Sequence, residues 1–197
     1  RRVREDRDQQ QRRSEPRLRF SFDMMGEGAR TMADADRYFA SYRHAIQQLA
    51  QAHPVAADTS PQNTDGISIK LSALHPRYED AQRDRVMNEL VPRVWQLCEM
   101  AATARINLTI DAEEVDRLEL SLDVFDALLQ RVGASHPAWT GFGLALQAYQ
   151  TRALELVEQV GALARQYGVR LMVRLVKGAY WDSEIKRAQE MGLPAYP

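Results

Sequence analysis

Short apolar runs alternate with longer segments of helical spacing along this chain from residue 19 onward. Five of the apolar runs are predicted to be strands, at residues 19–24, 66–73, 106–112, 141–149 and 169–178. Strands that alternate regularly with helices are typical of repeated βα units and a parallel sheet. The pattern therefore predicts an α/β fold.

Each predicted strand is followed by a helical pattern, at residues 33–52, 80–103, 118–131, 151–167 and from residue 182. Asp34 and Asp36 lie in the first turn of the first helix, where the helix dipole favours carboxylates. The helix at 151–167 should end at a left-handed Gly168. Its sheet-facing side is expected to consist of Leu154, Val157, Leu163 and Ala164.

Two architectures fit five consecutive βα units. One is a doubly wound open sheet, and the other is the first five units of a (β/α)8 TIM barrel. The first strand–helix turn, DMMGEGAR at residues 23–30, lacks the GxGxxG pattern of dinucleotide-binding sheets. The chain stops at Pro197 without a sixth strand, so we expect an incomplete barrel with an open sheet edge.

Composition narrows the class of protein. With 197 residues, 45% of them hydrophobic, the chain can bury a substantial core as one domain or part of a larger one. It has no apolar run of about 18 residues and no secretory pattern, which favours a cytoplasmic protein. Cys98 lies on an apolar helix face, where a packed thiol is expected.

The N-terminal residues 1–19 contain eight arginines and no lysine. Acidic residues are interleaved with them, and no aromatic residue that could stack on a base precedes Phe20. We therefore expect residues 1–16 to be a solvated linker or frayed helix and not a nucleic-acid arm. The barrel domain is then expected at residues 17–197.

Polar side chains occur near the carboxyl end of every predicted strand, where parallel strands of a barrel place their functional residues. They are Asp23, Lys70, Asp111, Gln147, Arg174 and Lys177. Arg174 and Lys177 lie on a strand expected to be buried, and buried cations need an anion, a cofactor or carboxylates beside them. The alternative is an exposed edge strand with solvated charges.

Other chemistries find little support in the sequence. The four histidines show no metal-binding spacing, and neither a GxSxG elbow nor a P-loop occurs. Glu113, Glu114 and Asp116 could bind a hard cation, although an acidic helix start is commoner.

Five segments of this chain resemble the proline dehydrogenase family, most closely the barrel of the bifunctional bacterial proline-utilisation proteins. The segments are residues 20–38, 66–78, 106–114, 144–150 and 173–189. The resemblance implies a (β/α)8 barrel that binds FAD and oxidises L-proline to 1-pyrroline-5-carboxylate, the first step of proline catabolism to glutamate. It further implies a quinone as electron acceptor, and it is compatible with peripheral membrane contact and an oligomer.

The resemblance also implies roles for individual residues. Lys70 would bind the proline carboxylate and Tyr180 would pack on the substrate ring. Asp111 and Arg174 match the positions regarded as catalytic, with Arg174 beside the flavin. The remaining cofactor contacts would come from Ala112, Gln147, Lys177, Gly178 and Ala179.

The family's remaining strands and last helix are absent from these 197 residues, so we expect this segment alone to be inactive. Two other functions are left open by the residues. Lys70 or Lys177 could form an imine in a Schiff-base aldolase, if its pKa were lowered. The chain could also be a scaffold without catalysis, using the arginine-rich start as a contact surface.

Overall fold

The computed structural model describes residues 18–52 and 60–194, so the predicted linker at residues 1–16 lies outside the described residues. Five strands form one parallel sheet: β1 (Ser21–Asp23), β2 (Gly66–Ile69), β3 (Asn107–Ile110), β4 (Phe142–Gln147) and β5 (Arg174–Val176). The helices between and after them are α2 (Met32–Ala52), α3 (Arg83–Thr103), α4 (Leu118–Ser135), α5 (Ala153–Tyr167) and α6 (Trp181–Glu190).

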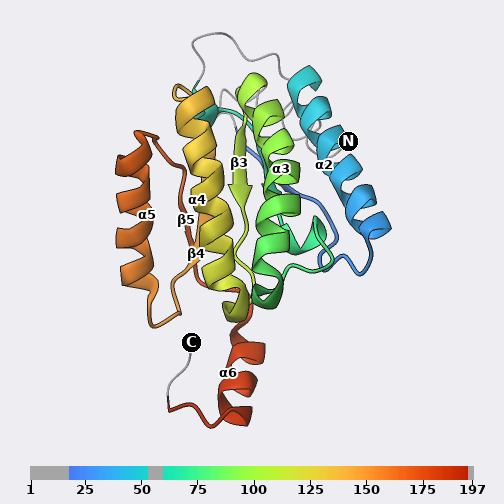
Figure 1. The fold of residues 1–197 in the computed structure, drawn as a ribbon. Helices are drawn as coiled ribbons and strands as arrows, with labels where there is room; N and C mark the ends of the chain where they lie inside the picture. The colour runs from blue at the N-terminus through green and yellow to red at the C-terminus, as the bar shows by residue number, and fades with distance from the viewer. Residues whose placement is uncertain (1–17, 53–59, 195–197) are drawn as a thin grey trace.

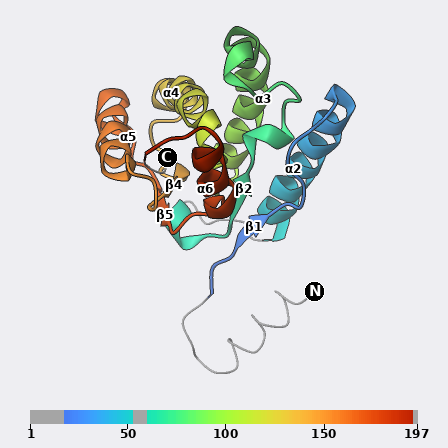
Figure 2. The same cartoon turned by 90° about the horizontal axis from the view of Figure 1, so that it is seen from below.

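The strands are ordered β1-β2-β3-β4-β5, each parallel to the strand before it. A doubly wound sheet reverses its strand order at a switch point, so the sequential order excludes that architecture. In Figure 2 the sheet is curled, and α2 to α5 form an arc outside it. This arrangement is that of the first five units of a (β/α)8 barrel, as predicted.

The strands are shorter than the apolar runs that predicted them. After Ile69 the chain turns at Lys70 into a 3-10 turn, Leu71–Ala73, although the apolar run continues to residue 73. The predicted strand at 169–178 contains only three strand residues, Arg174–Val176, and before them the Met172 N–H donates to the Phe142 carbonyl at 2.9 Å. Burial makes both stretches apolar, but only a continuous hydrogen-bond ladder makes a strand.

The three central strands form the packed wall of the sheet. Every residue of β2, β3 and β4 is buried. Phe142 of β4 stacks on Phe125 of α4 with ring centroids 5.2 Å apart, and both side chains are fully buried. Cys98 is packed in the same core, as expected. This wall supplies the rigid support for the side chains at the strand ends.

The edge strand β5 differs from its prediction. Arg174 and Val176 are half-buried, while Leu175 is 64% exposed. The expectation that Arg174 lies on a buried strand is therefore wrong. In the described part of the chain β5 pairs with β4 only, so one edge and one face of the strand are open to solvent.

The sheet-facing side of α5 was predicted correctly at Leu163, which packs against the core, but incorrectly at Leu154 and Val157. Leu156 and Val160 are the buried residues of α5, whereas Leu154 is 75% exposed and Val157 is 45% exposed. The helix carries two apolar stripes, and spacing alone does not tell which of them faces the sheet. Its end is as predicted, because Gly168 adopts φ 64° at the C-cap. Among the described helices, none has the length and apolar character needed to cross a membrane.

Candidate active site

A cavity of about 470 Å³ lies at the carboxyl ends of the strands, partly enclosed by the loop after β5. All nine residues to which the sequence resemblance gave a role line this cavity. They are Lys70, Asp111, Ala112, Gln147, Arg174, Lys177, Gly178, Ala179 and Tyr180. The volume is within the usual range of small-molecule sites.

Asp111 lies between two cations. Lys70 Nζ is 3.3 Å from Asp111 Oδ2, and the Arg174 guanidinium pairs with Asp111 Oδ1. Lys70 Nζ also lies 3.2 Å from Asp23 Oδ1. The four charged side chains thus come from β1, from the residues directly after β2 and β3, and from β5. The side chains of Lys70 and Asp111 are each 16% exposed, which strengthens their attraction relative to a surface pair.

The charge state of Lys70 follows from these contacts. Burial of the ammonium lowers its pKa, but hydrogen bonds and attraction from Asp23 and Asp111 outweigh burial, and the net pKa of Lys70 is raised. A lysine that attacks a carbonyl must lose its proton. The raised pKa therefore argues against Lys70 as the nucleophile of an aldolase and suits a fixed cation.

Ser68 is a site residue that the sequence reasoning missed. Its Oγ accepts a hydrogen bond from Arg174 Nη2 at 2.8 Å and lies 3.3 Å from Ser21 Oγ. The sequence did contain a signal for Ser68. Side chains alternate between the two faces of a strand, so Ser68, two residues before Lys70, lies on the same face as Lys70. A serine on the buried strand β2 needs a polar partner, and Arg174 supplies it.

Gln147 links the packed wall to the loop after β5. Its Nε2 donates to the Glu113 carbonyl at 3.0 Å, and its Oε1 accepts from the Ala179 N–H at 3.1 Å. In the same loop, Gly178 adopts φ 126°. A Cβ there would lie 2.0 Å from the Tyr149 ring, so both the backbone and the neighbouring ring require glycine.

The two remaining residues of the loop lie at the rim. Lys177 is exposed, and Tyr180 is half-buried. Burial raises the pKa of the Tyr180 phenol above its ordinary value, so the phenol stays neutral at physiological pH.

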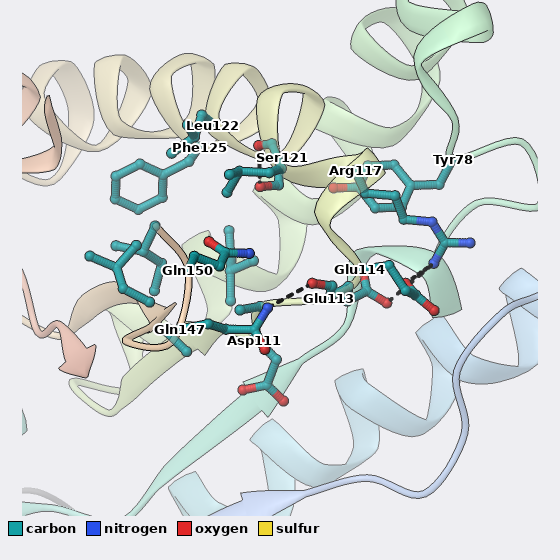
Figure 3. A pocket seen from close by; sticks show the side chains of 16 residues that line it. Tyr78, Asp111, Glu113, Glu114, Arg117, Ser121, Leu122, Phe125, Gln147 and Gln150 are labelled. Carbon is teal, nitrogen blue, oxygen red and sulfur yellow. Dashed lines mark hydrogen bonds and ion pairs between the residues drawn. The ribbon is translucent and has the colours of Figure 1, made fainter. Parts of the chain in front are cut away.

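A smaller cavity of about 20 Å³ lies beside Gln147, between the strand ends and α4, and Figure 3 shows the side chains around it. It shares Asp111 and Gln147 with the larger cavity. Its volume suffices for about one water molecule. It is therefore too small to be the ligand site itself.

The acidic residues after β3 have individual partners. Glu113 is buried, and its carboxylate pairs with the Ser72 hydroxyl and accepts the Ser72 N–H at 3.1 Å. Arg117 lies 3.0 Å from Glu114, as the dashed line in Figure 3 marks, and Arg187 lies 2.9 Å from Asp116. In the described residues no group of three acidic, histidine or cysteine side chains could hold a metal ion. The hard-cation hypothesis thus finds no support there.

Comparison with known proteins decides the family. The family model described as proline dehydrogenase matches residues 7–197. This chain belongs to the proline dehydrogenase family. The bifunctional protein PutA of Salmonella typhimurium is 50% identical over 180 residues, which are 91% of this chain and 13% of that protein. The protein of the same name from Escherichia coli is 49% identical over 180 residues, again 91% of this chain and 13% of that protein.

Solved structures of the family agree with the fold. A crystal structure of Bradyrhizobium japonicum proline utilization A matches with a TM-score of 0.84 and 54% identity, over 97% of this chain and 19% of that one. Proline utilization A from Bdellovibrio bacteriovorus, inactivated by N-propargylglycine, matches with a TM-score of 0.80 and 25% identity, over 95% and 20% of the two chains. This proline dehydrogenase segment therefore spans a minor part of each relative.

Proposed function

We propose that this chain forms the first five βα units of an FAD-dependent dehydrogenase that oxidises L-proline to 1-pyrroline-5-carboxylate. The observation that carries the proposal is the cavity at the strand ends, in which Lys70 and Arg174 share the carboxylate of Asp111. Membership of the proline dehydrogenase family supports the substrate.

The residues present suit a flavin. Arg174 Nε is buried without a hydrogen-bond partner in the described chain, so an acceptor of a bound molecule could use it. Gly178 presents backbone without a side chain to the cavity. When bound, FAD would accept the hydride that leaves the carbon beside the proline nitrogen.

Each polar side chain has a role that its charge explains. Lys70 holds the substrate carboxylate as a permanent cation, since its raised pKa keeps it protonated. With FAD bound, Arg174 would supply a fixed positive charge beside the group that accepts the hydride. Asp111 orients both cations by its two oxygens, which keeps the pair fixed before the substrate binds.

The remaining residues shape the site. Tyr180 packs on the substrate ring with its neutral phenol. The Gln147 amide has a second N–H on Nε2 and a second lone pair on Oε1, beyond those used by Glu113 and Ala179, and these would hydrogen-bond the flavin. The cofactor is lined by Ala112, Lys177, Gly178 and Ala179.

The wider setting is part of the same proposal. The electrons pass to a quinone, and the enzyme is cytoplasmic with peripheral membrane contact during that transfer. The 197 residues belong to a longer bifunctional polypeptide and are inactive alone, because the cavity is bounded by the open edge of β5. The relatives named bifunctional support this, since this chain spans 13% of their length.

The test is an absorbance spectrum of the full-length polypeptide, recorded without oxygen before and after L-proline is added. Flavin bands that bleach with L-proline and stay unchanged with D-proline are expected. Lys70→Met should weaken proline binding strongly, whereas Lys186→Met, which removes an exposed cation that pairs with Glu190, should not. A protein that binds no flavin when FAD is supplied contradicts the proposal, and trapping of a carbonyl substrate with borohydride would then test Lys177 as an imine-forming residue.

A further inference from the structure

The helix α6 occupies an unusual place for a barrel helix. In Figures 1 and 2 it lies beyond the carboxyl ends of the strands, not on the outer face with α2 to α5. It begins directly after Tyr180, which is its N-cap residue and also lines the cavity. The position of α6 therefore determines the position of Tyr180.

Glu184 connects this helix to the chain segment that follows β3. The backbone N–H of Glu184 donates to the Tyr180 carbonyl at 3.0 Å, and its side-chain Oε1 accepts the Val115 N–H at 2.7 Å. Glu184 is 3% exposed, although it is a charged residue in a helix of which only it and Ala188 are buried. One residue thus joins Tyr180 to the 3-10 turn after β3 through two hydrogen bonds.

Aromatic contacts hold the other side of the same loop. Tyr149, two residues after the end of β4, packs edge-on against Trp181 with ring centroids 5.3 Å apart, and its ring lies against Gly178. The loop that carries Ala179 and Tyr180 is therefore held by Tyr149, which contacts Gly178 before it and Trp181 after it, and by the Glu184 hydrogen bond in α6.

We propose that Glu184 is a positioning residue for substrate binding: by accepting the Val115 N–H it fixes the first turn of α6 and thereby the Tyr180 ring at the cavity. This inference rests on the proposed function, in which that ring packs on the substrate. The burial of Glu184 fits this role, because a buried carboxylate is costly unless it accepts hydrogen bonds, and the Val115 N–H supplies one.

Glutamine at position 184 keeps an oxygen that can accept the Val115 N–H, whereas alanine removes it. Glu184→Ala should raise the KM for proline about tenfold with a smaller change in kcat, since a hydrogen bond to a charged group is lost. Glu184→Gln should stay within about twofold of the unchanged protein. Lys186→Ala is the matched control, because it removes an exposed ion pair within the same helix, and it should leave the KM for proline unchanged.

A second pair of variants removes the donor and leaves α6 unaltered. Val115 is the first residue of a 3-10 turn, where proline is tolerated, and Glu114 before it has φ −60° and ψ 151°, the conformation preferred before proline. Val115→Pro should reproduce the effect of Glu184→Ala, and Val115→Ala should not. In the double variant Val115→Pro/Glu184→Ala the two effects should not add. This pair decides the question even if Glu184→Ala fails to fold.

The measurements are made on the full-length polypeptide with FAD bound. Besides KM and kcat, calorimetry gives the dissociation constant of a proline analogue with oxygen in place of the ring nitrogen, and absorbance gives the FAD content per chain. The expected result is weaker analogue binding in Glu184→Ala and Val115→Pro at unchanged FAD content. Unchanged binding in Val115→Pro, or binding in Glu184→Gln as weak as in Glu184→Ala, overturns the inference. If the unchanged protein neither binds the analogue nor is reduced by L-proline, the proposed function itself fails.

Discussion

Two sides of the same cavity are built differently. The packed wall, β2 to β4, buries every strand residue, whereas β5 buries none of its three residues and α6 buries only Glu184 and Ala188. We call β5, the loop at residues 177–180 and α6 the open flank. Packing holds the wall, and a small number of polar and aromatic contacts hold the flank. The difference teaches that Lys70 and Asp111 are fixed by the core, while Arg174 and Tyr180 depend on their individual partners.

The largest difference between the two sides is expected when apolar side chains are truncated to alanine on each side. Leu108→Ala in β3 removes a fully buried side chain and should lower the free energy of unfolding by about 2–5 kcal/mol. Leu175→Ala in β5 removes a side chain that is 64% exposed and should change it by less than about 0.5 kcal/mol. Denaturant unfolding of the 197-residue chain measures both. Equal costs would show that the flank is packed as tightly as the wall.

A charge substitution tests the junction between the two sides. Asp111→Asn removes the negative charge shared by Lys70 and Arg174, and kcat/KM for proline should fall on the order of 100- to 1000-fold in the full-length polypeptide. Asp123→Asn, which breaks an exposed pair with Arg83 on the outer helices, is the control and should leave kcat/KM unchanged. A similar loss in both variants would point to a general effect of charge.

Two glycines with positive φ compare the loop of the open flank with the turn that follows α6. Gly178→Ala places a methyl group on the Tyr149 ring and should abolish FAD retention, with a backbone cost of about 1–3 kcal/mol. Gly192→Ala, at φ 64° with open space around it, should cost about 1–2 kcal/mol and retain the flavin. The flavin absorbance per chain distinguishes them. Retention of FAD by Gly178→Ala would contradict the close approach that we propose.

The smallest effect is expected at the outer surface of α3. The Glu89 carboxylate accepts hydrogen bonds from Arg85 and His75, which hold its pKa below the ordinary value. A lowered folded-state pKa stabilises the protein above the unfolded pKa, and this contribution is lost as pH falls through the folded value. The Tm of the unchanged protein should therefore exceed that of Glu89→Gln at pH 7, with a gap that closes below about pH 4. A gap that widens in acid would reverse the assignment.

The sequence predicted those parts of the fold for which the pattern of apolar residues has a single physical explanation. Alternating apolar runs arise from a sheet with helices on its outside, so the order of the elements and the bounds of α2 were predicted within one residue. The exposed face of β5 and the buried face of α5 were not. Both depend on which neighbours an element meets, and local spacing does not contain that information.

The site divides in the same way. The nine residues that the motif resemblance pointed to all line one cavity. The motifs lie at the carboxyl ends of strands, which a barrel brings together. Ser68 was missed although its strand position, two residues before Lys70, carried a signal, because its hydrogen-bond partner Arg174 is far away in sequence. Glu184 was missed for the same reason, since its partner Val115 precedes it by 69 residues.

The sequential order of the strands also has a consequence for how the protein is made. Each strand pairs with the one before it. During translation the N-terminal residues leave the ribosome first, so the βα units can join an already formed sheet one at a time. At about 5–20 residues per second, the Lys70–Asp111 pair would be complete several seconds before Arg174 emerges. The Arg174 guanidinium would then dock onto an Asp111 carboxylate that Lys70 already holds in place.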